Sequence, residues 1–399
     1  MRVLMVSDVY FPRVNGVSTS IRTFRQSLAE IGVTVDLIAP AYPGAVEEDG
    51  VYRVPSRYLA FDPEDRMMRR SEIDALLPVL RGQAYQLVHI QTPFIAHYAG
   101  LALARALGVP VVTTYHTFFE EYLHHYARIV PRGWTRALAR RFSRGQCNAT
   151  AGVVAPSTAM RDALRSYGVT VPIEVIPTGI PLAEFDHGDG EAFRQAHAIP
   201  LNAEVALYVG RVAHEKNIDL LLHMAVAVAA ARPDFLLMIA GEGPALPHLK
   251  ALAEQLGLTG RVRFVGYLDR ARALVDCYRA ADVFVFGSTT ETQGLVLLEA
   301  MALGVPVVAI AAMGARDILL PEQGCLCAPI DAAGFALVVQ HLLADAELRA
   351  GKAVEARAYA LSWSAPATAE RMASFYRQVL AAQPAGEVAG TLVANTPPA

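Results

Sequence analysis

The residues best placed to do chemistry are two carboxylates in the stretch Ser288–Gly304. Glu291 lies in a loop after an apolar strand pattern, and Glu299 lies eight residues further on, inside an apolar helix that we expect to begin at about Gly294. The amides of Gly294 and Leu295 would lack helical partners, and with the helix dipole they favour a phosphate. Carboxylates can bind the hydroxyls of a sugar, and the neighbouring amides can bind a diphosphate. This combination suits a sugar nucleotide. The alternative is an ordinary amphipathic helix with one solvated glutamate, although a carboxylate among apolar neighbours needs a partner.

A second polar group, Gly210–Asn217, follows the first strand pattern of the second half of the chain. Gly210 permits close backbone approach to a ligand. Arg211 offers a planar fork of donors and Lys216 a compact charge, and both suit a diphosphate. The alternative is a basic loop in which Glu215 pairs with Lys216 in solvent.

Two further segments in the first half follow strand patterns. Tyr10–Ser20 contains Gly16 and several hydroxyls, which could line a cleft, but it lacks the G-x-G-x-x-G pattern, and a dinucleotide is therefore disfavoured. Thr113–Thr117 contains His116 at the polar end of a strand. A histidine there can hydrogen-bond a substrate, although a structural histidine is commoner.

The elements that must position these residues alternate between short apolar runs and longer helical patterns. Such alternation predicts an α/β fold with parallel sheets that are covered on both faces. Ligands bind at the carboxyl ends of parallel strands, so we expect two Rossmann-like domains to face an interdomain cleft. The predicted strands are Val3–Val9, Thr34–Ala39, Val51–Val54, Leu87–Gln91, Val109–Tyr115, Gly152–Ala155, Glu174–Ile176, Val205–Val209, Phe235–Ala240, Arg261–Val265, Val283–Phe286 and Val305–Ile310.

The chain length of 399 residues exceeds what one core usually serves, which favours two domains. We place them at residues 1–180 and 200–362, because the segment Thr178–Leu201 between them is rich in Gly and Pro and lacks a strong period. A helix follows at about Ala365–Ala381, and residues 383–399 have the composition of a disordered tail.

The composition excludes several classes of protein. A net charge of −3 gives no reason to expect a nucleic-acid partner. Four cysteines are too few for a disulfide framework, and they do not complete a zinc site. The N-terminus lacks a signal-peptide pattern, and no apolar run approaches the ~20 residues of a membrane span. We therefore expect a cytoplasmic protein, which could still bind a membrane surface.

A basic stretch supports that last possibility. Tyr122–Arg161 contains no acidic residue, and Trp134, Leu138 and Phe142 form an apolar line at helical spacing. A basic helix with aromatic residues suits an anionic membrane. The alternative is a solvated basic face with the Trp and Phe packed inward. Five arginines of this stretch recur every four residues and a sixth lies among them: Arg128, Arg132, Arg136, Arg140 and Arg144, with Arg141.

The motifs together resemble the retaining glycosyltransferases of family 4, which have the GT-B fold. The resemblance rests on the E-x7-E pair and on the Gly-Arg…Glu-Lys-Asn motif of Gly210–Asn217, and it covers nearly the whole chain. It implies that the last helix crosses back to the first domain. It also implies a role for each motif residue. Arg211 and Lys216 would bind the diphosphate, Glu299 would bind the ribose, and Val265–Tyr267 would lie beside the base. Glu291, Gly294 and Leu295 would contact the transferred sugar, Gly16 would approach the phosphate, and His116 would contact the sugar near the reaction centre.

Within this family, the segments Thr114–Tyr126, Pro177–Ile180 and Ser288–Gly294 look like those of diacylglycerol glucosyltransferases. The expected activity is transfer of a hexose, with glucose from UDP-glucose as the first choice, to a lipid acceptor on the inner face of the cell membrane. The sequence has no D-x-D motif, and side-chain cations can replace a metal, so we expect no cofactor and no obligatory metal. The alternatives are mannosyl or glucosyl transfer to a soluble or polysaccharide acceptor, a sugar-nucleotide epimerase, and a non-catalytic binding protein.

Overall fold

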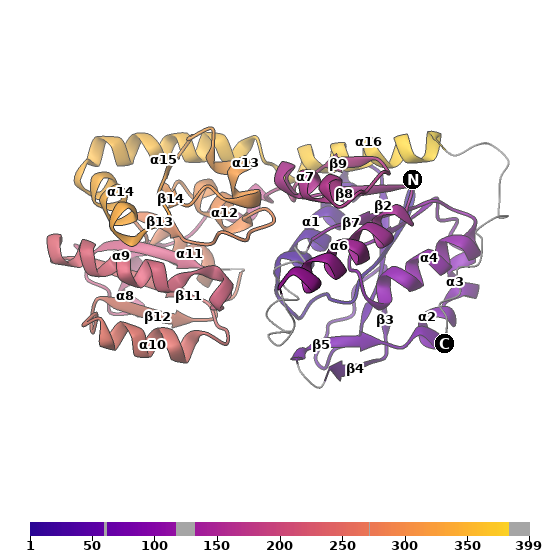
Figure 1. Cartoon of the computed structure of the whole chain (residues 1–399), viewed down its shortest axis with the longest axis horizontal. Helices are drawn as coiled ribbons and strands as arrows, with labels where there is room; N and C mark the ends of the chain where they lie inside the picture. The colour runs from indigo at the N-terminus through magenta and orange to yellow at the C-terminus, as the bar shows by residue number, and fades with distance from the viewer. Residues whose placement is uncertain (60–61, 117–131, 271, 383–399) are drawn as a thin grey trace. The chain divides into compact units, whose positions relative to one another are not determined.

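The computed structural model describes residues 1–59, 62–116, 132–270 and 272–382. The chain divides into two compact units, drawn in Figure 1. Unit 1 comprises Met1–Pro156, Arg161–Ile176 and Ala369–Ala399, and unit 2 comprises Ser157–Met160 and Pro177–Thr368.

Unit 1 is built on a seven-stranded parallel sheet with the order β3-β2-β1-β6-β7-β8-β9. Val3 and Met5 of β1 contribute to one apolar cluster, and Leu4 and Val6 contribute to a second. Because neighbouring side chains of a strand point to opposite faces, both faces of this sheet must be covered. The strands are β1 (Arg2–Val6), β2 (Thr34–Pro40), β3 (Val51–Val54), β6 (Leu87–Ile90), β7 (Val111–Thr114), β8 (Gly152–Ala155) and β9 (Ile173–Val175).

The helices of unit 1 cover the two faces of that sheet. Phe24 of α1 and Tyr376 of α16 belong to the cluster of Val3 and Met5, and α4 belongs to the cluster on the other face. The helices are α1 (Gly16–Glu30), α2 (Arg70–Asp74), α3 (Leu77–Arg81), α4 (Ile95–Leu107), α6 (Arg132–Asn148), α7 (Thr158–Ser166), whose first turn lies in unit 2, and α16 (Ala365–Ala381), which joins unit 1 at Ala369.

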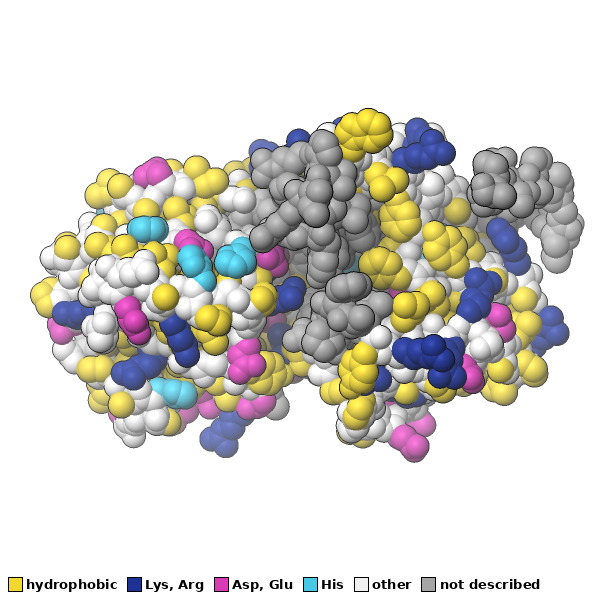
Figure 2. Space-filling view, turned by 60° about the horizontal axis from the view of Figure 1, so that its bottom comes forward, with side chains coloured by type: hydrophobic (Ala, Val, Ile, Leu, Met, Phe, Trp, Pro, Cys, Tyr) yellow, Lys and Arg dark blue, Asp and Glu magenta, His cyan; other side chains and the backbone are white. Residues whose placement is uncertain are grey.

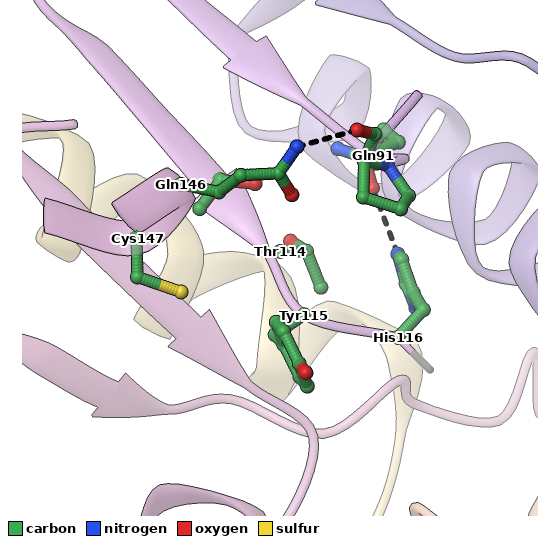
Figure 3. A pocket seen from close by; sticks show the side chains of 8 residues that line it. Gln91, Thr114, Tyr115, His116, Gln146 and Cys147 are labelled. Atoms are coloured by element: carbon green, nitrogen blue, oxygen red, sulfur yellow. Dashed lines mark hydrogen bonds between the residues drawn. The ribbon is translucent and has the colours of Figure 1, made fainter. Parts of the chain in front are cut away.

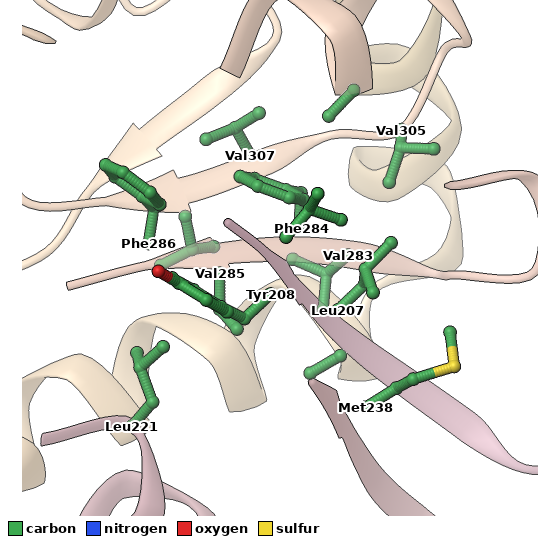
Figure 4. Close-up of a cluster of buried hydrophobic side chains, with 14 of the residues drawn as sticks. Leu207, Tyr208, Leu221, Met238, Val283, Phe284, Val285, Phe286, Val305 and Val307 are labelled. Atoms are coloured by element: carbon green, nitrogen blue, oxygen red, sulfur yellow. The ribbon is translucent and has the colours of Figure 1, made fainter. Parts of the chain in front are cut away.

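Unit 2 is built on a six-stranded parallel sheet with the order β12-β11-β10-β13-β14-β15. Aromatic rings fill the centre of its core, where Phe286 stacks on both Tyr208 and Phe284 with centroids 5.9 and 6.2 Å away (Figure 4). The strands are β10 (Glu204–Val209), β11 (Phe235–Ala240), β12 (Val262–Gly266), β13 (Val283–Phe286), β14 (Val307–Ala309) and β15 (Cys325–Cys327). The helices are η1 (Leu182–Phe185), α8 (Gly190–Ala196), η2 (His214–Lys216), α9 (Ile218–Ala231), α10 (Leu246–Gln255), α11 (Ala273–Arg279), α12 (Leu295–Ala302), η3 (Met313–Ala315), α13 (Arg316–Leu319), α14 (Ala332–Ala344) and α15 (Ala346–Leu361).

The structure has a strand at each predicted position and adds three. Two of them, β4 (Ser56–Leu59) and β5 (Asp62–Met68), form an antiparallel hairpin. The charged sequence of β5 has no apolar alternation, so the sequence does not identify it. The third, β15, is three residues long at the sheet edge and was too short to recognise.

The sequence predicts a linker at Thr178–Leu201, and the structure corrects this prediction. It contains η1 and α8, and Phe185 and Phe193 are buried in the core of unit 2. Gly190 lets the start of α8 approach the backbone carbonyl of Arg279, where an added Cβ would lie 2.3 Å from the oxygen. The glycines therefore allow close packing there.

Among the described residues, no helix is both long and apolar enough to cross a bilayer. The predicted tail, residues 383–399, lies outside the described part of the chain.

Candidate active site

Lys216 and Glu291 form an ion pair that joins two loops of unit 2. Lys216 ends η2, in the loop after β10, and Glu291 lies in the loop between β13 and α12. Their side chains are 22% and 15% exposed, so both are accessible but largely shielded from water. The alternative in which Lys216 pairs with Glu215 is wrong, because Glu291 is the carboxylate that it meets.

Hydrogen bonds from side chains to backbone carbonyls hold the same two loops together. Asn217 Nδ2 donates to the carbonyl of Gly287 (3.1 Å), and Thr290 Oγ1 donates to the carbonyl of Glu215 (3.3 Å). Asn217 has a φ of 55°, in the left-handed region that asparagine tolerates better than most residues. The two loops thus form one rim at the carboxyl ends of β10 and β13.

Glycines let the loop after β10 pack against the loop after β11. A Cβ added to Gly241 would lie 1.9 Å from the carbonyl oxygen of Gly210, and one added to Gly243 would lie 2.3 Å from that of Val212. Val212 N also donates to the carbonyl of Glu242 (2.9 Å). Arg211 is exposed at this rim, one residue after Gly210.

The start of α12 is fixed from two sides. Gly294 is its N-cap with a φ of 95°, a conformation that disfavours other residues. On one side, Gly314 N donates to the carbonyl of Glu291 (2.8 Å). On the other, Gln293 makes two hydrogen bonds with the backbone of Thr178, with lengths of 2.8 and 2.7 Å. The predicted residue Leu295 is the first of the helix.

Glu299 lies one turn further along α12 and is 2% exposed. Arg270 donates to its Oε1, and the hydroxyl of Tyr278 donates to its Oε2 (2.8 Å). The carboxylate of Glu299 raises the pKa of Arg270. The carboxylate therefore has the partner that its apolar neighbours required, and the alternative of a solvated glutamate is wrong. Sequence reasoning missed Arg270 and Tyr278, because no spacing rule relates them to Glu299.

In unit 1, His116 lies at the end of β7 in a small pocket (Figure 3). Its Nε2 is 2.9 Å from Gln91 Oε1, so the ring donates that hydrogen bond. Desolvation lowers the pKa of His116 to about 4, which leaves the imidazole neutral at pH 7. Gln146 closes the same pocket by donating to the carbonyl of Pro93 (2.6 Å).

A second histidine lies behind this pocket. His89 is fully buried between the hydroxyls of Tyr376 and Thr114, each 2.7 Å from a ring nitrogen. Burial, with a smaller effect of His116, lowers its pKa to about 3. Neither His89 nor Gln91 was identified from the sequence, because both read as ordinary residues of a buried strand.

Two other predicted residues lie at element ends. Gly16 begins α1, whose N-cap is Asn15, and an added Cβ would meet no atom of the described residues within 4 Å. Packing therefore does not explain this glycine. Tyr267 is exposed immediately after β12, where Gly266 has a φ of 74°.

Within the basic stretch, residues 132–148 form α6, whose apolar line does not face the core throughout, and Arg128 lies outside the described residues. Trp134 is 78% exposed and Leu138 is 64% exposed, while Phe142 is half-buried. The interpretation of an inward-packed tryptophan is therefore wrong for Trp134. Exposed arginines accompany these residues: Arg136, Arg140, Arg141 and Arg144. The side chain of Arg132 lies outside the described part of the structure.

Comparison with known proteins connects these features to a class. Family models match residues 14–184 ("Glycosyltransferase Family 4") and 189–358 ("Glycosyl transferases group 1"). A similar relative is an alpha-monoglucosyldiacylglycerol synthase of Streptococcus pneumoniae, 34% identical over 77% of this chain and 71% of that protein. A GDP-mannose-dependent alpha-mannosyltransferase of Mycolicibacterium smegmatis is 31% identical over 95% of this chain and 98% of that protein.

Solved structures agree on the fold. Sucrose-phosphate synthase from Thermosynechococcus elongatus is 23% identical, covers 96% of this chain and 100% of that chain, and has a TM-score of 0.76. Anabaena HepE in complex with UDP-glucose is 19% identical and has a TM-score of 0.75. The match covers 95% of this chain and 100% of that chain.

The two parallel sheets and these neighbours show the GT-B fold, which confirms the predicted fold class. The chain belongs to the group 1 and family 4 glycosyltransferases, and it is a retaining hexosyltransferase.

Proposed function

We propose that this protein transfers glucose from UDP-glucose, with retention, to a diacylglycerol-type lipid at the cytoplasmic face of a membrane. The observation that carries the donor side is the Lys216–Glu291 pair beside the start of α12. The acceptor side is supported by two relatives with the name alpha-monoglucosyldiacylglycerol synthase, at 34% and 27% identity.

The donor diphosphate would bind where charge can be stabilised as the sugar leaves. Lys216 and Arg211 supply cations, and the amides of Gly294 and Leu295 supply donors at a helix start. Glu291 orients Lys216 and has a second oxygen for a sugar hydroxyl. Gly210 keeps the rim open to the phosphates. The leaving diphosphate would take the proton of the acceptor hydroxyl on the same face of the sugar, which gives retention.

The nucleoside would lie between α12 and the end of β12. Glu299 would accept hydrogen bonds from the ribose hydroxyls, with Arg270 and Tyr278 fixing its orientation. Each carboxylate oxygen can accept two hydrogen bonds, so each oxygen of Glu299 keeps the capacity to accept one more. Tyr267, exposed after β12, would lie beside the base.

Unit 1 would supply Gly16 to the phosphate and His116 to the transferred sugar. Because His116 is neutral at pH 7, it would act as a hydrogen-bond donor or acceptor and not as a cation. The reaction would need no obligatory metal, because Lys216 and Arg211 already provide positive charge at the diphosphate. Chelation with EDTA should therefore leave turnover within about twofold of its value in untreated enzyme.

Helix α6 would bring the enzyme to the lipid. An exposed tryptophan and leucine among arginines match the composition of helices that lie in the membrane interface. Figure 2 shows a face of unit 1 on which hydrophobic side chains lie beside Lys and Arg.

A second candidate is mannosyl transfer from GDP-mannose. The observation in its favour is the match to the mannosyltransferase of Mycolicibacterium smegmatis, which extends over more of this chain than the match to the glucosyltransferase of Streptococcus pneumoniae. A relative with the name D-inositol 3-phosphate glycosyltransferase, 32% identical over 77% of this chain, keeps a soluble acceptor as a further outcome.

One experiment separates these candidates. Purified enzyme is incubated with UDP-glucose, UDP-galactose or GDP-mannose, each with diacylglycerol vesicles, with inositol phosphate or without acceptor, and the products are analysed by mass. The proposal predicts a glucosyl lipid that forms only with UDP-glucose and vesicles. A mannosyl product, or transfer to the soluble acceptor alone, would contradict it. Isomerised donor without acceptor would indicate an epimerase.

A further inference from the structure

Three side chains with metal-binding atoms converge on the surface of unit 2. His214 comes from η2, Asp219 from the first turn of α9, and His248 from the first turn of α10. One ligand atom from each lies within 4.8 Å of the other two. His248 Nε2 is 2.5 Å from Asp219 Oδ1, and the two imidazole rings have centroids 5.5 Å apart. None of the three belongs to the proposed donor site.

We propose that His214, Asp219 and His248 form a binding site for a divalent transition-metal ion, with Zn²⁺ as the best fit. Two imidazoles and one carboxylate are a ligand set that Zn²⁺ accepts, with water in the fourth position. Mg²⁺ and Ca²⁺ prefer sets made entirely of oxygen, so they fit this cluster poorly.

Small side-chain rotations would bring the three ligand atoms to the spacing that a metal requires. Bonds of about 2.05 Å to a tetrahedral ion place neighbouring ligand atoms about 3.4 Å apart. His248 Nε2 and Asp219 Oδ1 are 2.5 Å apart and would separate by about 1 Å on binding, and side-chain rotation would draw in any pair that is further apart, up to the limit of 4.8 Å. Both histidines are exposed, and they can rotate without disturbing the core.

The backbone that carries the three ligands is already held in place. Ala245 N donates to the carbonyl of Val212 (3.0 Å), which ties the start of α10 to the loop after β10. Asn217 N donates to the carbonyl of His214 (3.1 Å) immediately before α9 begins. A ligand set on a fixed scaffold loses less entropy on binding a metal than one on free loops.

A bound ion would clamp η2 to α9 and α10. Lys216 ends η2, two residues after His214, so the clamp would hold the loop of the donor site. The proposed role is stabilisation of this loop, and the reaction itself would need no metal. Binding can therefore be tested without any activity measurement.

The full chain is purified without a polyhistidine tag and treated with chelator to remove bound metal. It is then titrated with Zn²⁺ in a calorimeter. We expect one ion per chain with roughly micromolar affinity, and a rise in Tm of about 5 °C under saturating Zn²⁺. His214→Ala and His248→Ala should each weaken binding by at least about tenfold. His223→Ala is the matched control, because it removes an exposed imidazole of α9 that is outside the cluster.

Co²⁺ supplies a second readout, since its visible absorption reports the geometry of its ligands. The spectrum should change on binding in the parent protein and in His223→Ala, and it should stay that of the hydrated ion in the two cluster variants. Equal binding by the cluster variants and the control, or no uptake of Zn²⁺ at micromolar concentration, overturns the proposal. All variants should keep the parent Tm in the presence of chelator, which verifies that they fold.

Discussion

Lys216 is the residue on which the proposed donor chemistry depends most. Its ammonium pairs with Glu291 in a largely shielded position, where a charge acts more strongly on a diphosphate than it would in water. We expect Lys216→Ala to lower kcat by about 10²–10³-fold, as loss of a group that stabilises developing charge does in other enzymes. Steady-state kinetics with the donor identified by the product screen would measure this.

A matched control is Lys250→Ala, which removes an exposed ammonium of α10. It should keep kcat unchanged. Unfolding curves should be close to that of the parent for both variants, because the remaining Glu291 still reaches water. Near-parental turnover in Lys216→Ala would remove this lysine from the proposed phosphate site.

For Glu299 we predict an effect on the free energy of unfolding. Its carboxylate is buried and neutralises Arg270, so Glu299→Gln leaves a largely buried guanidinium without its counter-charge. Breaking a buried ion pair from one side costs about 3–5 kcal/mol, and Gln can still accept the hydrogen bond of Tyr278, so we expect a loss of about 3 kcal/mol.

Urea unfolding, monitored by hydrogen exchange of the amides in β13 and α12, would measure the loss in the free energy of unfolding of unit 2. The control is Glu347→Gln, which makes the same change from carboxylate to amide at an exposed position of α15. It should alter the free energy of unfolding by less than about 0.5 kcal/mol. An unchanged unfolding transition in Glu299→Gln would mean that the pair with Arg270 contributes no net stability.

At the scale of elements, α6 carries the prediction on membrane binding. Arg136 and Arg141 are exposed, and each basic residue near an anionic surface contributes about 1 kcal/mol. Replacing both by Glu should therefore weaken sedimentation with anionic vesicles by at least about 30-fold at low salt. The control reverses two exposed arginines of unit 1 elsewhere, Arg81 and Arg105. Equal loss in both double variants would point to net charge and away from α6.

The elements also show what the sequence could predict. Apart from the three-residue strand β15, the strands of both parallel sheets could be predicted from short, mainly apolar runs, because strands covered on both faces contain few polar residues. The antiparallel hairpin β4–β5 could not, since its charged residues follow no apolar period. Likewise, the sequence predicts a linker where α8 forms, because Gly188 and Gly190 suggest flexibility, whereas in the structure they permit close packing against α11.

The candidate site could be predicted less completely than the fold. Glu291 and Gly294 belong to one local motif and Lys216 belongs to another, so each residue could be identified from its own motif, whereas the ion pair between Lys216 and Glu291 could not. Arg270 and Gln293 act through partners far away in the sequence, Glu299 and Thr178, and only folding brings these pairs into contact. The exposure of Trp134 likewise depends on which side of α6 faces the sheet.

At the scale of the whole molecule, unit 1 is completed by the C-terminal end of the chain. Tyr376 of α16 lies against His89 of β6, 287 residues earlier, and Phe375 packs over Gly152. A fragment that ends near residue 180 would lack these contacts and leave the cluster of Val3 and Met5 partly uncovered. The first half of the sequence therefore does not contain all of its own core.

This unit should lose stability in acid, and the sign follows from its buried groups. His89, His97 and His116 have pKa values of about 3, 4 and 4 in the folded state, below the ordinary value of 6.5. They bind protons in the unfolded state first, so they reduce stability as the pH falls from 6.5 toward 4. Burial raises the pKa of Asp8 to about 6, which acts in the opposite direction over the same range, since the folded state takes up that proton first.

Near pH 5 the unfolded state binds about two protons more than the folded state, because the three histidines outweigh the single carboxylate. The free energy of unfolding should therefore fall by about 2.5 kcal/mol for each unit by which the pH is lowered there. Urea unfolding of unit 1 between pH 4.5 and 6, followed by hydrogen exchange in β6 and β7, would measure this slope. His89→Gln removes one titrating group and should lower the slope by about half. Asp8→Asn keeps an acceptor for the amide of Ala96 and places an NH2 group opposite the hydroxyl of Thr92, which can accept from it, and this variant should steepen the slope. Because slopes are compared, a variant that is less stable at every pH still gives a valid result, and a slope that both changes leave unaltered would show that other groups control acid unfolding.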